Sequence, residues 1–101
     1  MTSRTSQLSR GEVDQRIAEI RNRMDELDGR LVALLNERAS CASEIGCLKD
    51  LVGLEIYQPD REIEVLKNVR SLNKGPLEGD AVARLFERII DEARRLERST
   101  G

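Results

Sequence analysis

The chain has 101 residues, which fits one domain with a modest core. Charged residues make up 36%, hydrophobic residues 39% and aromatic residues only 2%, a mixture typical of helical bundles rather than β-sandwiches or barrels. The net charge of −2, without a basic block, argues against a nucleic-acid partner, whose phosphates require a clustered cationic face. The absence of histidine excludes imidazole bases and most zinc sites, so no metal is expected.

The sequence also lacks the features of a membrane or exported protein. No apolar run approaches the roughly 20 residues of a membrane span, and the N-terminal residues contain no apolar signal stretch. Cys41 and Cys47 lie on different faces of any helix that contains both, so they cannot form a disulfide within it. We therefore expect a soluble cytoplasmic protein without a membrane partner, in which both cysteines are core or near-core residues without a redox role.

Residues 1–8 are polar and rich in Ser and Thr, which predicts a disordered tail before a single helical domain over residues 9–101. Ser9 and Glu12 have the spacing of a capping box, so a helix is expected to begin there. Apolar positions then follow at intervals of four and three, without a proline before Gly53, and predict one long helix over residues 9–52. This heptad seam consists of Val13, Ile17, Ile20, Met24, Leu27, Leu31, Leu34, Arg38, Cys41, Ile45, Leu48 and Val52.

Two shorter helices are expected to complete an all-α, three-helix protomer. Pro59 suits the first position of the second helix, after a loop over residues 53–58, and residues 73–76 break that helix. The third helix is expected to begin near residues 78–80. The expected inner face of the second helix contains Ile63, Leu66, Leu72 and either Val69 or Arg70. The third helix is expected to run through Val82, Leu85, Phe86, Ile89, Ile90, Ala93, Leu96 and Glu97, with Glu97 on the inner line of Phe86, Ile90 and Ala93.

The length of the first helix predicts a dimer. A helix over residues 9–52 extends about 65 Å, whereas a compact globule of this size has a radius of gyration of about 13 Å. The two shorter helices cannot cover the whole seam, so we expect an intertwined homodimer bundle in which a second copy covers the remainder. The alternative is a break in residues 39–43 or at Gly46, which would give a compact monomer; the unbroken heptad phase argues against it.

Charged residues stand where this pattern requires hydrophobic ones. Arg38 occupies a seam position, where a buried guanidinium needs an anion, either a structural carboxylate or a ligand. Lys49 projects from the same face about 16 Å further along the axis, and Glu97 continues the inner face of the third helix. Arg21 lies about 25 Å from Arg38, so only the partner's Arg21, in an antiparallel dimer, could reach the same ligand.

Arg61 and Glu62 open the second helix beside the loop, where solvation at the surface is the alternative to a functional role. Together these charges predict a polar pocket inside a helical bundle that suits a small dianion with a hydroxyl group. Without histidine, a placed nucleophile or a metal cluster, chemistry there must rely on positioning and electrostatics.

Four segments resemble the all-α (AroQ class) chorismate mutases: residues 20–38 (IRNRMDELDGRLVALLNER), 44–49 (EIGCLK), 57–62 (YQPDRE) and 84–90 (RLFERII). The resemblance spans roughly residues 13–97. It implies an intertwined dimer of three-helix protomers that converts chorismate to prephenate by an intramolecular Claisen rearrangement in aromatic amino-acid biosynthesis. It also implies that no cofactor and no covalent intermediate are needed.

The resemblance carries roles over to individual residues. Arg38 and the partner's Arg21 are expected to clamp the two substrate carboxylates, because arginine binds carboxylates bidentately. Lys49 is expected to reach the ether oxygen, which gains negative charge as the C–O bond breaks. Glu62 is expected to accept a hydrogen bond from the ring hydroxyl, and Arg61 to help hold the loop and the carboxylates.

Three binding positions depart from the commonest pattern of the family. Gln58 stands where Asp is frequent, Ala93 where some members have Ser, and Glu97 where Gln is common. An ionised carboxylate at Glu97 would repel the ether oxygen, whereas a neutral carboxyl would donate a hydrogen bond to it. We therefore expect a catalytic Glu97 to act in its neutral form, with activity that rises as the pH falls.

Two kinds of alternative remain. The same scaffold could act as an isochorismate pyruvate-lyase or an aminodeoxychorismate mutase, although the lyase type tends to lack an acid equivalent to Glu62. A non-catalytic helical dimerisation module would explain the seam, but it would not explain Arg38, Lys49 and an inward Glu97.

Overall fold

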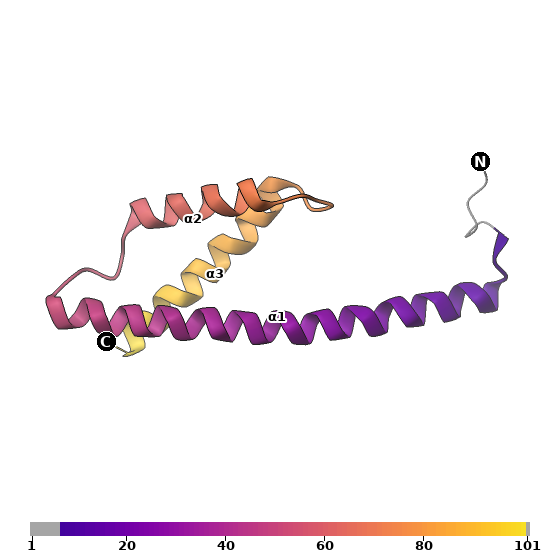
Figure 1. Ribbon diagram of the computed structural model, residues 1–101, viewed down its shortest axis with the longest axis horizontal. Coiled ribbons are helices and arrows are strands. Elements are labelled where there is room, and N and C mark those ends of the chain that lie inside the picture. The colour runs from indigo at the N-terminus through magenta and orange to yellow at the C-terminus, as the bar shows by residue number, and fades with distance from the viewer. Residues whose placement is uncertain (1–6, 101) are drawn as a thin grey trace. The chain divides into compact units, whose positions relative to one another are not determined.

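The computed structural model describes residues 7–100, which form three helices and no strand (Figure 1). These are α1 (Arg10–Val52), α2 (Pro59–Leu72) and α3 (Gly79–Thr100), so the all-α prediction with one long first helix is confirmed. The alternative break in residues 39–43 or at Gly46 is wrong, because α1 continues through both. The tail predicted over residues 1–8 falls mostly outside the described residues. None of the three helices is long and apolar enough to cross a membrane.

The chain forms two compact parts, one ending at Leu34 and the other beginning at Leu35. The first part contains the N-terminal stretch of α1, and its start confirms the predicted cap. The Ser9 Oγ accepts a hydrogen bond from the Glu12 backbone N–H at 3.2 Å and donates one to Glu12 Oε1 at 3.1 Å. Ser9 thus satisfies a backbone donor that the first turn of a helix leaves without a partner.

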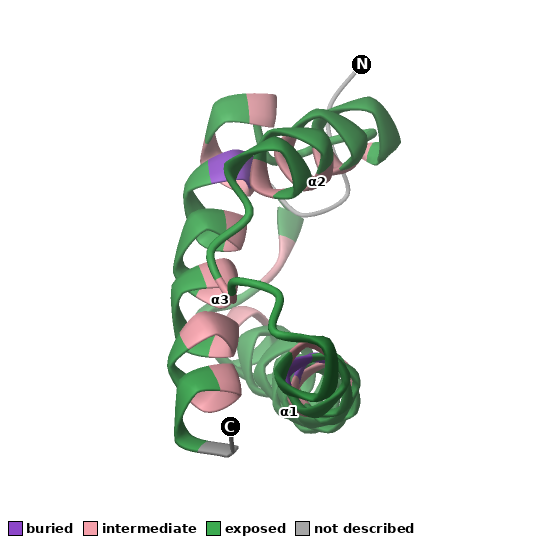
Figure 2. Cartoon of the chain, turned by 90° about the vertical axis from the view of Figure 1, so that its left-hand side faces the viewer, coloured by how far each residue is buried: buried purple, intermediate pink, exposed green. Residues whose placement is uncertain are grey.

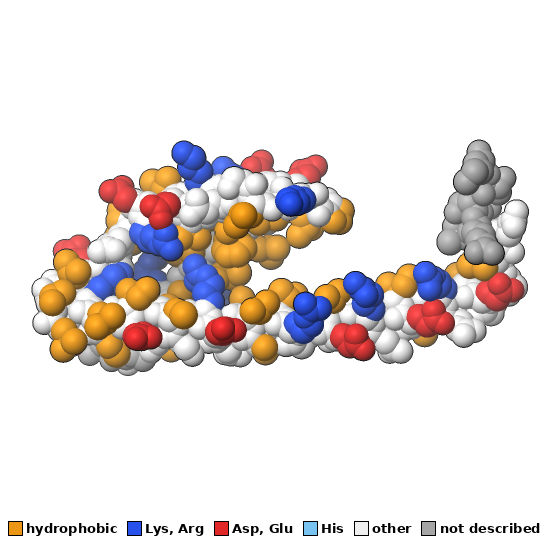
Figure 3. Space-filling model, in the orientation of Figure 1, with side chains coloured by type: hydrophobic (Ala, Val, Ile, Leu, Met, Phe, Trp, Pro, Cys, Tyr) orange, Lys and Arg blue, Asp and Glu red, His pale blue; other side chains and the backbone are white. Residues whose placement is uncertain are grey.

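Six of the seven seam positions of this first part are exposed, with exposed fractions between 39% and 60%, and Val13 is half-buried. Figure 3 shows hydrophobic side chains in a row along this stretch, with basic and acidic side chains beside them. The residues are Ile17, Ile20, Met24, Leu27, Leu31 and Leu34. A single helix cannot bury its own apolar stripe, so this stretch needs another surface to pack against.

The second part contains the last turns of α1 together with α2 and α3, and α2 packs along α3. Within the described residues, burial is confined to a few positions, on α1 and α3 (Figure 2). Ala83 on α3 is 1% exposed, and Ala42 and Gly46 are buried on α1. Small residues of this kind allow neighbouring helices to approach closely.

The face of α2 that packs inward differs from the predicted one. Ile63 and Leu72 are 64% and 75% exposed, so their assignment to the inner face of α2 is wrong for this chain. The half-buried positions of α2 are Glu62, Val65, Leu66 and Val69. Leu66 and Val69 confirm the prediction, whereas Glu62 and Val65 take the places expected for Ile63 and Leu72. The inner face is therefore turned toward Glu62 by less than the roughly 100° that separates neighbouring residues.

Cys41 and Cys47 are both exposed and unpaired, so the interpretation of them as core or near-core residues is wrong for this chain. The stretch of α1 that contains them is covered at Ala42 and Gly46 instead. Each cysteine is adjacent in sequence to one of these buried residues. Because neighbouring residues are about 100° apart around a helix, both cysteines point away from the buried face.

The turn after α1 begins the loop that leads to α2. Gly53 has a φ of 70°, the left-handed conformation that glycine adopts without steric cost. The Leu54 N–H donates to the Lys49 carbonyl at 2.9 Å and the Gly53 N–H to the Asp50 carbonyl at 3.4 Å, which together form a Schellman motif. This confirms the predicted end of the first helix, and Pro59 opens α2 as predicted.

Candidate active site

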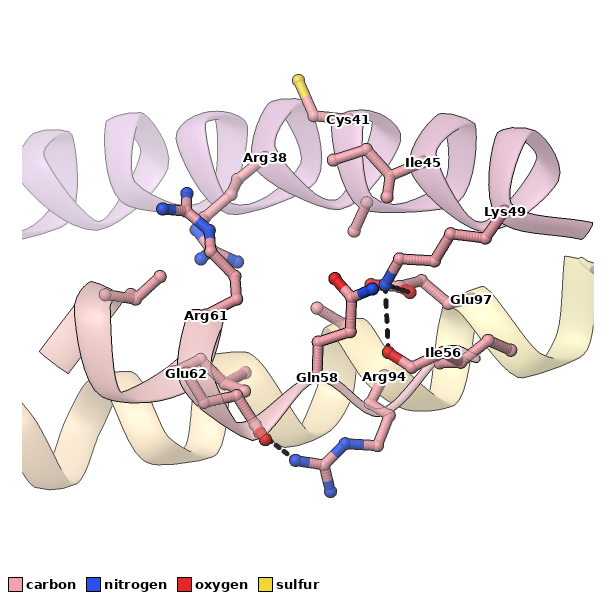
Figure 4. Close-up of a pocket in the computed structure, with 14 residues that line it drawn as sticks. Arg38, Cys41, Ile45, Lys49, Ile56, Gln58, Arg61, Glu62, Arg94 and Glu97 are labelled. Atoms are coloured by element: carbon pink, nitrogen blue, oxygen red, sulfur yellow. Dashed lines mark hydrogen bonds and ion pairs between the residues drawn. The ribbon is translucent and has the colours of Figure 1, made fainter. Parts of the chain in front are cut away.

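A pocket of about 380 Å³ lies within the second part, between the last turns of α1, the loop and first turns of α2, and α3 (Figure 4). This volume lies in the range of sites for small molecules. The pocket is lined by Arg38, Cys41, Ala42, Ile45, Lys49, Ile56, Gln58, Arg61, Glu62, Val65, Ile90, Ala93, Arg94 and Glu97.

Most of the site residues predicted from the sequence meet in this one pocket. They come from all three helices and from the loop before α2, so the fold joins segments far apart in the sequence. The predicted residues that line it are Arg38, Lys49, Gln58, Arg61, Glu62, Ala93 and Glu97. Arg21 lies on the N-terminal stretch of α1, and its contribution from a partner subunit stays a prediction.

A close approach of α1 and α3 brings Lys49 to Glu97. Gly46 is buried, and a Cβ added to it would lie 3.1 Å from both the Cα and the Cβ of Glu97 and 3.2 Å from its carbonyl oxygen. Such contacts are tighter than ordinary van der Waals contacts, so a larger residue at this position would require α3 to shift by a few tenths of an ångström. Lys49 follows Gly46 by about one helical turn and therefore extends from α1 beside Glu97.

Lys49 and Glu97 form an ion pair in the wall of the pocket (Figure 4). The Lys49 Nζ donates to Glu97 Oε2 at 3.3 Å and to the Ile56 carbonyl oxygen at 3.0 Å. The two side chains are only 12% and 14% exposed. The pair and the loop carbonyl together hold the ammonium group at a defined point of the pocket, since charge-assisted hydrogen bonds are stronger than neutral ones.

Arg38 differs from Lys49, because it forms no ion pair with any carboxylate of residues 7–100. Its side chain is half-buried and extends toward the same end of the pocket as Arg61 (Figure 4). Arg61 forms an ion pair with Glu64 on the exposed face of α2. The structural ion pair considered for Arg38 is therefore not formed within the described chain, and its guanidinium can bind an anion in the pocket.

Arg94 is a pocket residue that the sequence analysis missed. It forms an ion pair with Glu62 of α2, and its guanidinium carbon lies 5.0 Å from the centroid of the Tyr57 ring. The spacing contained the signal, because Arg94 follows Ile90 by four residues and precedes Glu97 by three. Residues at these intervals share one face of a helix, the same face that supplied Glu97.

The pocket has an excess of positive charge. Its lining contains four cationic side chains and two carboxylates, which leaves two positive charges without a counterpart in the pocket. Figure 3 shows Lys and Arg side chains gathered between the last turns of α1 and α2. Cationic groups in a partly enclosed pocket attract an anion with complementary charge, so the site suits a small dianion. Residues 7–100 contain no cluster of His, Cys, Asp and Glu that could hold a metal ion.

Comparisons with known proteins agree with the family resemblance seen in the sequence, and the matches cover most of the chain. A family model described as chorismate mutase type II matches residues 20–98. A bifunctional chorismate mutase/prephenate dehydratase of Neisseria gonorrhoeae is 42% identical over 86 residues, which cover 85% of this chain and 23% of the relative. A chorismate mutase of Methanocaldococcus jannaschii is 28% identical over 85 residues, which cover 83% of this chain and 86% of the relative.

A solved structure of chorismate mutase (form II) from Thermus thermophilus has a TM-score of 0.81 and 34% sequence identity, covering 82% of this chain and 94% of that one. The chain spans about a quarter of the length of the bifunctional relatives it matches. The family model covers more than half of the chain, and the matched range contains every residue of the pocket. The resemblance noted in the sequence is therefore confirmed, and the chain belongs to the type II chorismate mutase family.

Proposed function

We propose that the chain is a chorismate mutase, which converts chorismate to prephenate in aromatic amino-acid biosynthesis. The observation that carries the proposal is the pocket with two excess positive charges, in which Arg38 has no carboxylate partner among residues 7–100. Chorismate is a dianion with a ring hydroxyl and an ether oxygen, so its charge complements that of the pocket. The reaction is an intramolecular rearrangement, which a site can accelerate by holding the reactive conformer and stabilising developing charge.

Arginine side chains bind the two carboxylates in this proposal. Arg38 takes one carboxylate, and the partner's Arg21 takes the other across the dimer interface. Arg61 lines the same end of the pocket and adds positive charge beside the loop. Bidentate binding by guanidinium groups would hold the substrate folded, with its reacting carbon atoms close together.

Lys49 and Glu97 act on the ether oxygen. The Ile56 carbonyl holds the Lys49 Nζ at 3.0 Å, so the ammonium group is already oriented before the substrate binds. It interacts more strongly with the oxygen as negative charge develops there, and this difference lowers the barrier. Glu97 lies beside the same ammonium group and donates a hydrogen bond to the ether oxygen when its carboxyl is neutral.

Three further residues complete the proposed binding site. Glu62 accepts a hydrogen bond from the ring hydroxyl. The amide of Gln58 points into the pocket toward Lys49, where it can donate to an oxygen of the substrate (Figure 4). Ala93 lines the wall without a hydroxyl group, so it contributes shape rather than a hydrogen bond.

We also propose that the active form is an intertwined homodimer without a cofactor. The support is the exposed apolar seam of α1, which includes Met24 and Leu31 at 55% exposure each. A second copy of the chain offers the same apolar stripe, and isologous pairing would bury both. The two free cysteines suit a reducing compartment, and we place the enzyme in the cytoplasm on that ground.

The test is an assay of the purified chain with chorismate, in which loss of chorismate absorbance is followed and the product is identified. Prephenate supports the proposal. Pyruvate formed from isochorismate, or turnover of an amino analogue alone, would assign the scaffold to the lyase or the aminodeoxychorismate mutase. If none of these substrates is turned over, the result would support a non-catalytic dimerisation module instead.

The matched variants are Arg38→Ala and Arg95→Ala. Arg38→Ala should lower kcat/KM by about 100-fold or more, because a charged donor is removed from the binding site. Arg95 lies on α3 outside the pocket, is 68% exposed and pairs with Glu92, so its replacement should leave kcat/KM within about twofold. Equal activity of Arg38→Ala and the wild type would contradict the proposed site.

A further inference from the structure

The ion pair between Arg94 and Glu62 differs from the surface ion pairs of this chain. It joins α3 to α2, and its side chains are only 25% and 23% exposed. The pairs of Arg61 with Glu64 and of Arg88 with Glu92 lie within one helix, and their side chains are more than half exposed. Exposed pairs of that kind contribute little, whereas a half-buried pair between helices constrains both side chains.

The guanidinium of Arg94 is held by several groups. Besides Glu62, the Asp91 Oδ1 lies 3.6 Å from its Nη1, and the Tyr57 ring centroid lies 5.0 Å from its central carbon. A planar guanidinium can bind carboxylates at its edge while its face lies over an aromatic ring. Arg94 is therefore fixed by residues of α2, α3 and the loop before α2.

This arrangement determines where the carboxylate of Glu62 points. Figure 4 shows it turned toward Arg94 and away from Arg38 and Arg61. The Glu62 Oε1 accepts the hydrogen bond from Arg94, whereas Oε2 has no hydrogen-bond partner among residues 7–100. Without Arg94, the flexible glutamate side chain could turn toward Arg38 and Arg61, whose positive charges the substrate carboxylates require.

We infer that Arg94 is a positioning residue: it holds Glu62 by one carboxylate oxygen, so that the other accepts the ring hydroxyl of the substrate. Arg94 thereby sets the preference for substrates that carry this hydroxyl group. This assignment rests on the proposed function. It adds to that function a residue which does not itself contact the reacting atoms.

The test compares chorismate with its analogue that lacks the ring hydroxyl, in the wild type and in Arg94→Leu. A site built to accept a hydrogen bond from a hydroxyl rejects the analogue that lacks it. We expect the wild type to prefer chorismate by about 10-fold to 100-fold in kcat/KM. Arg94→Leu should lower kcat/KM on chorismate by about 10-fold to 100-fold. Its preference for chorismate over the analogue should fall below about threefold.

A double-variant cycle separates positioning from a general loss of structure. In the Glu62→Gln background, Arg94→Leu should cause less than about a twofold further loss in kcat/KM, because the carboxylate that it positions is gone. Arg95→Leu is the matched control and should keep the discrimination of the wild type, since Arg95 lies outside the pocket. Thermal unfolding of every variant checks that it is folded.

If Arg94→Leu does not fold, Arg94→Lys replaces it in the same comparison of substrates. It keeps the positive charge but lacks the planar fork, and it should retain only part of the discrimination. Wild-type discrimination in the folded Arg94 variants, or a full additional loss in the Glu62→Gln background, would overturn the assignment of Arg94 alone. Absence of chorismate turnover in the wild type would instead overturn the proposed function.

Discussion

Glu97 combines two roles that conflict at the scale of a single residue. In the pocket, Lys49 Nζ lies 3.3 Å from its Oε2, so the two residues form an ion pair. In the proposed reaction, the ether oxygen between them gains negative charge, and an ionised carboxylate would oppose that change. An uncharged hydrogen-bond donor at this position would remove the conflict.

The first prediction follows from this conflict. Glu97→Gln keeps a hydrogen-bond donor beside Lys49 but carries no negative charge, so its kcat/KM should equal or exceed that of the wild type. Glu97→Ala lacks the donor and should lower kcat/KM by about tenfold or more. Steady-state kinetics of both variants beside the wild type measure the effect. A loss in Glu97→Gln as large as that in Glu97→Ala would refute the role of Glu97 as a donor.

At the scale of the helices, the site depends on how closely α1 approaches α3. Gly46 of α1 lies against the backbone of Glu97, and Lys49 one turn later reaches its carboxylate. The contact involves backbone atoms, which cannot rotate away as a side-chain end can. The geometry of the ion pair therefore rests on the missing side chain of one glycine.

The second prediction concerns Gly46→Ala. The added methyl group should force α1 and α3 apart, lower the free energy of unfolding by about 1–3 kcal/mol and reduce kcat/KM by at least about tenfold. Gly29→Ala is the matched control, because a Cβ at Gly29 meets nothing within 4 Å and alanine favours the helix. Urea unfolding and steady-state kinetics measure both effects. Wild-type stability and activity in Gly46→Ala would show that the helices can adjust.

At the scale of the whole molecule, the described chain leaves much of its apolar surface exposed. Its buried hydrophobic residues are Ala42 and Ala83, whereas large side chains such as Leu34 and Leu48 are 60% and 56% exposed. Burial of such surface is the main favourable term in folding. A folded unit with this surface is expected to be stable only in association, which in our proposal is the homodimer.

The third prediction tests whether each site uses residues of both subunits. Arg21→Ala and Arg38→Ala homodimers should both lose about 100-fold or more in kcat/KM. Co-expression of the two variants should restore about a quarter of wild-type activity, because half of the dimers are mixed and one site of each is intact. Activity as low as in the parents, with mixed dimers shown by mass spectrometry, would place both arginines in a site within one chain.

The sequence by itself determined the features that depend on local physics. The heptad spacing predicted the course of α1, Ser9 its start and Gly53 its end, because each signal acts within a few residues along the chain. Arg38 at a seam position, with Lys49 on the same face of the helix, predicted a polar pocket, because such residues are costly inside a bundle without an anion.

Only the tertiary structure decided how the faces of different helices meet. The spacing on α2 favoured Ile63 as an inner residue, yet Ile63 is exposed and the adjacent Glu62 faces α3, where it pairs with Arg94. The approach at Gly46 has the same origin, since a glycine in a helix does not indicate which backbone lies opposite. Local spacing specifies a stripe on each helix, whereas the contact between stripes depends on packing across the whole bundle.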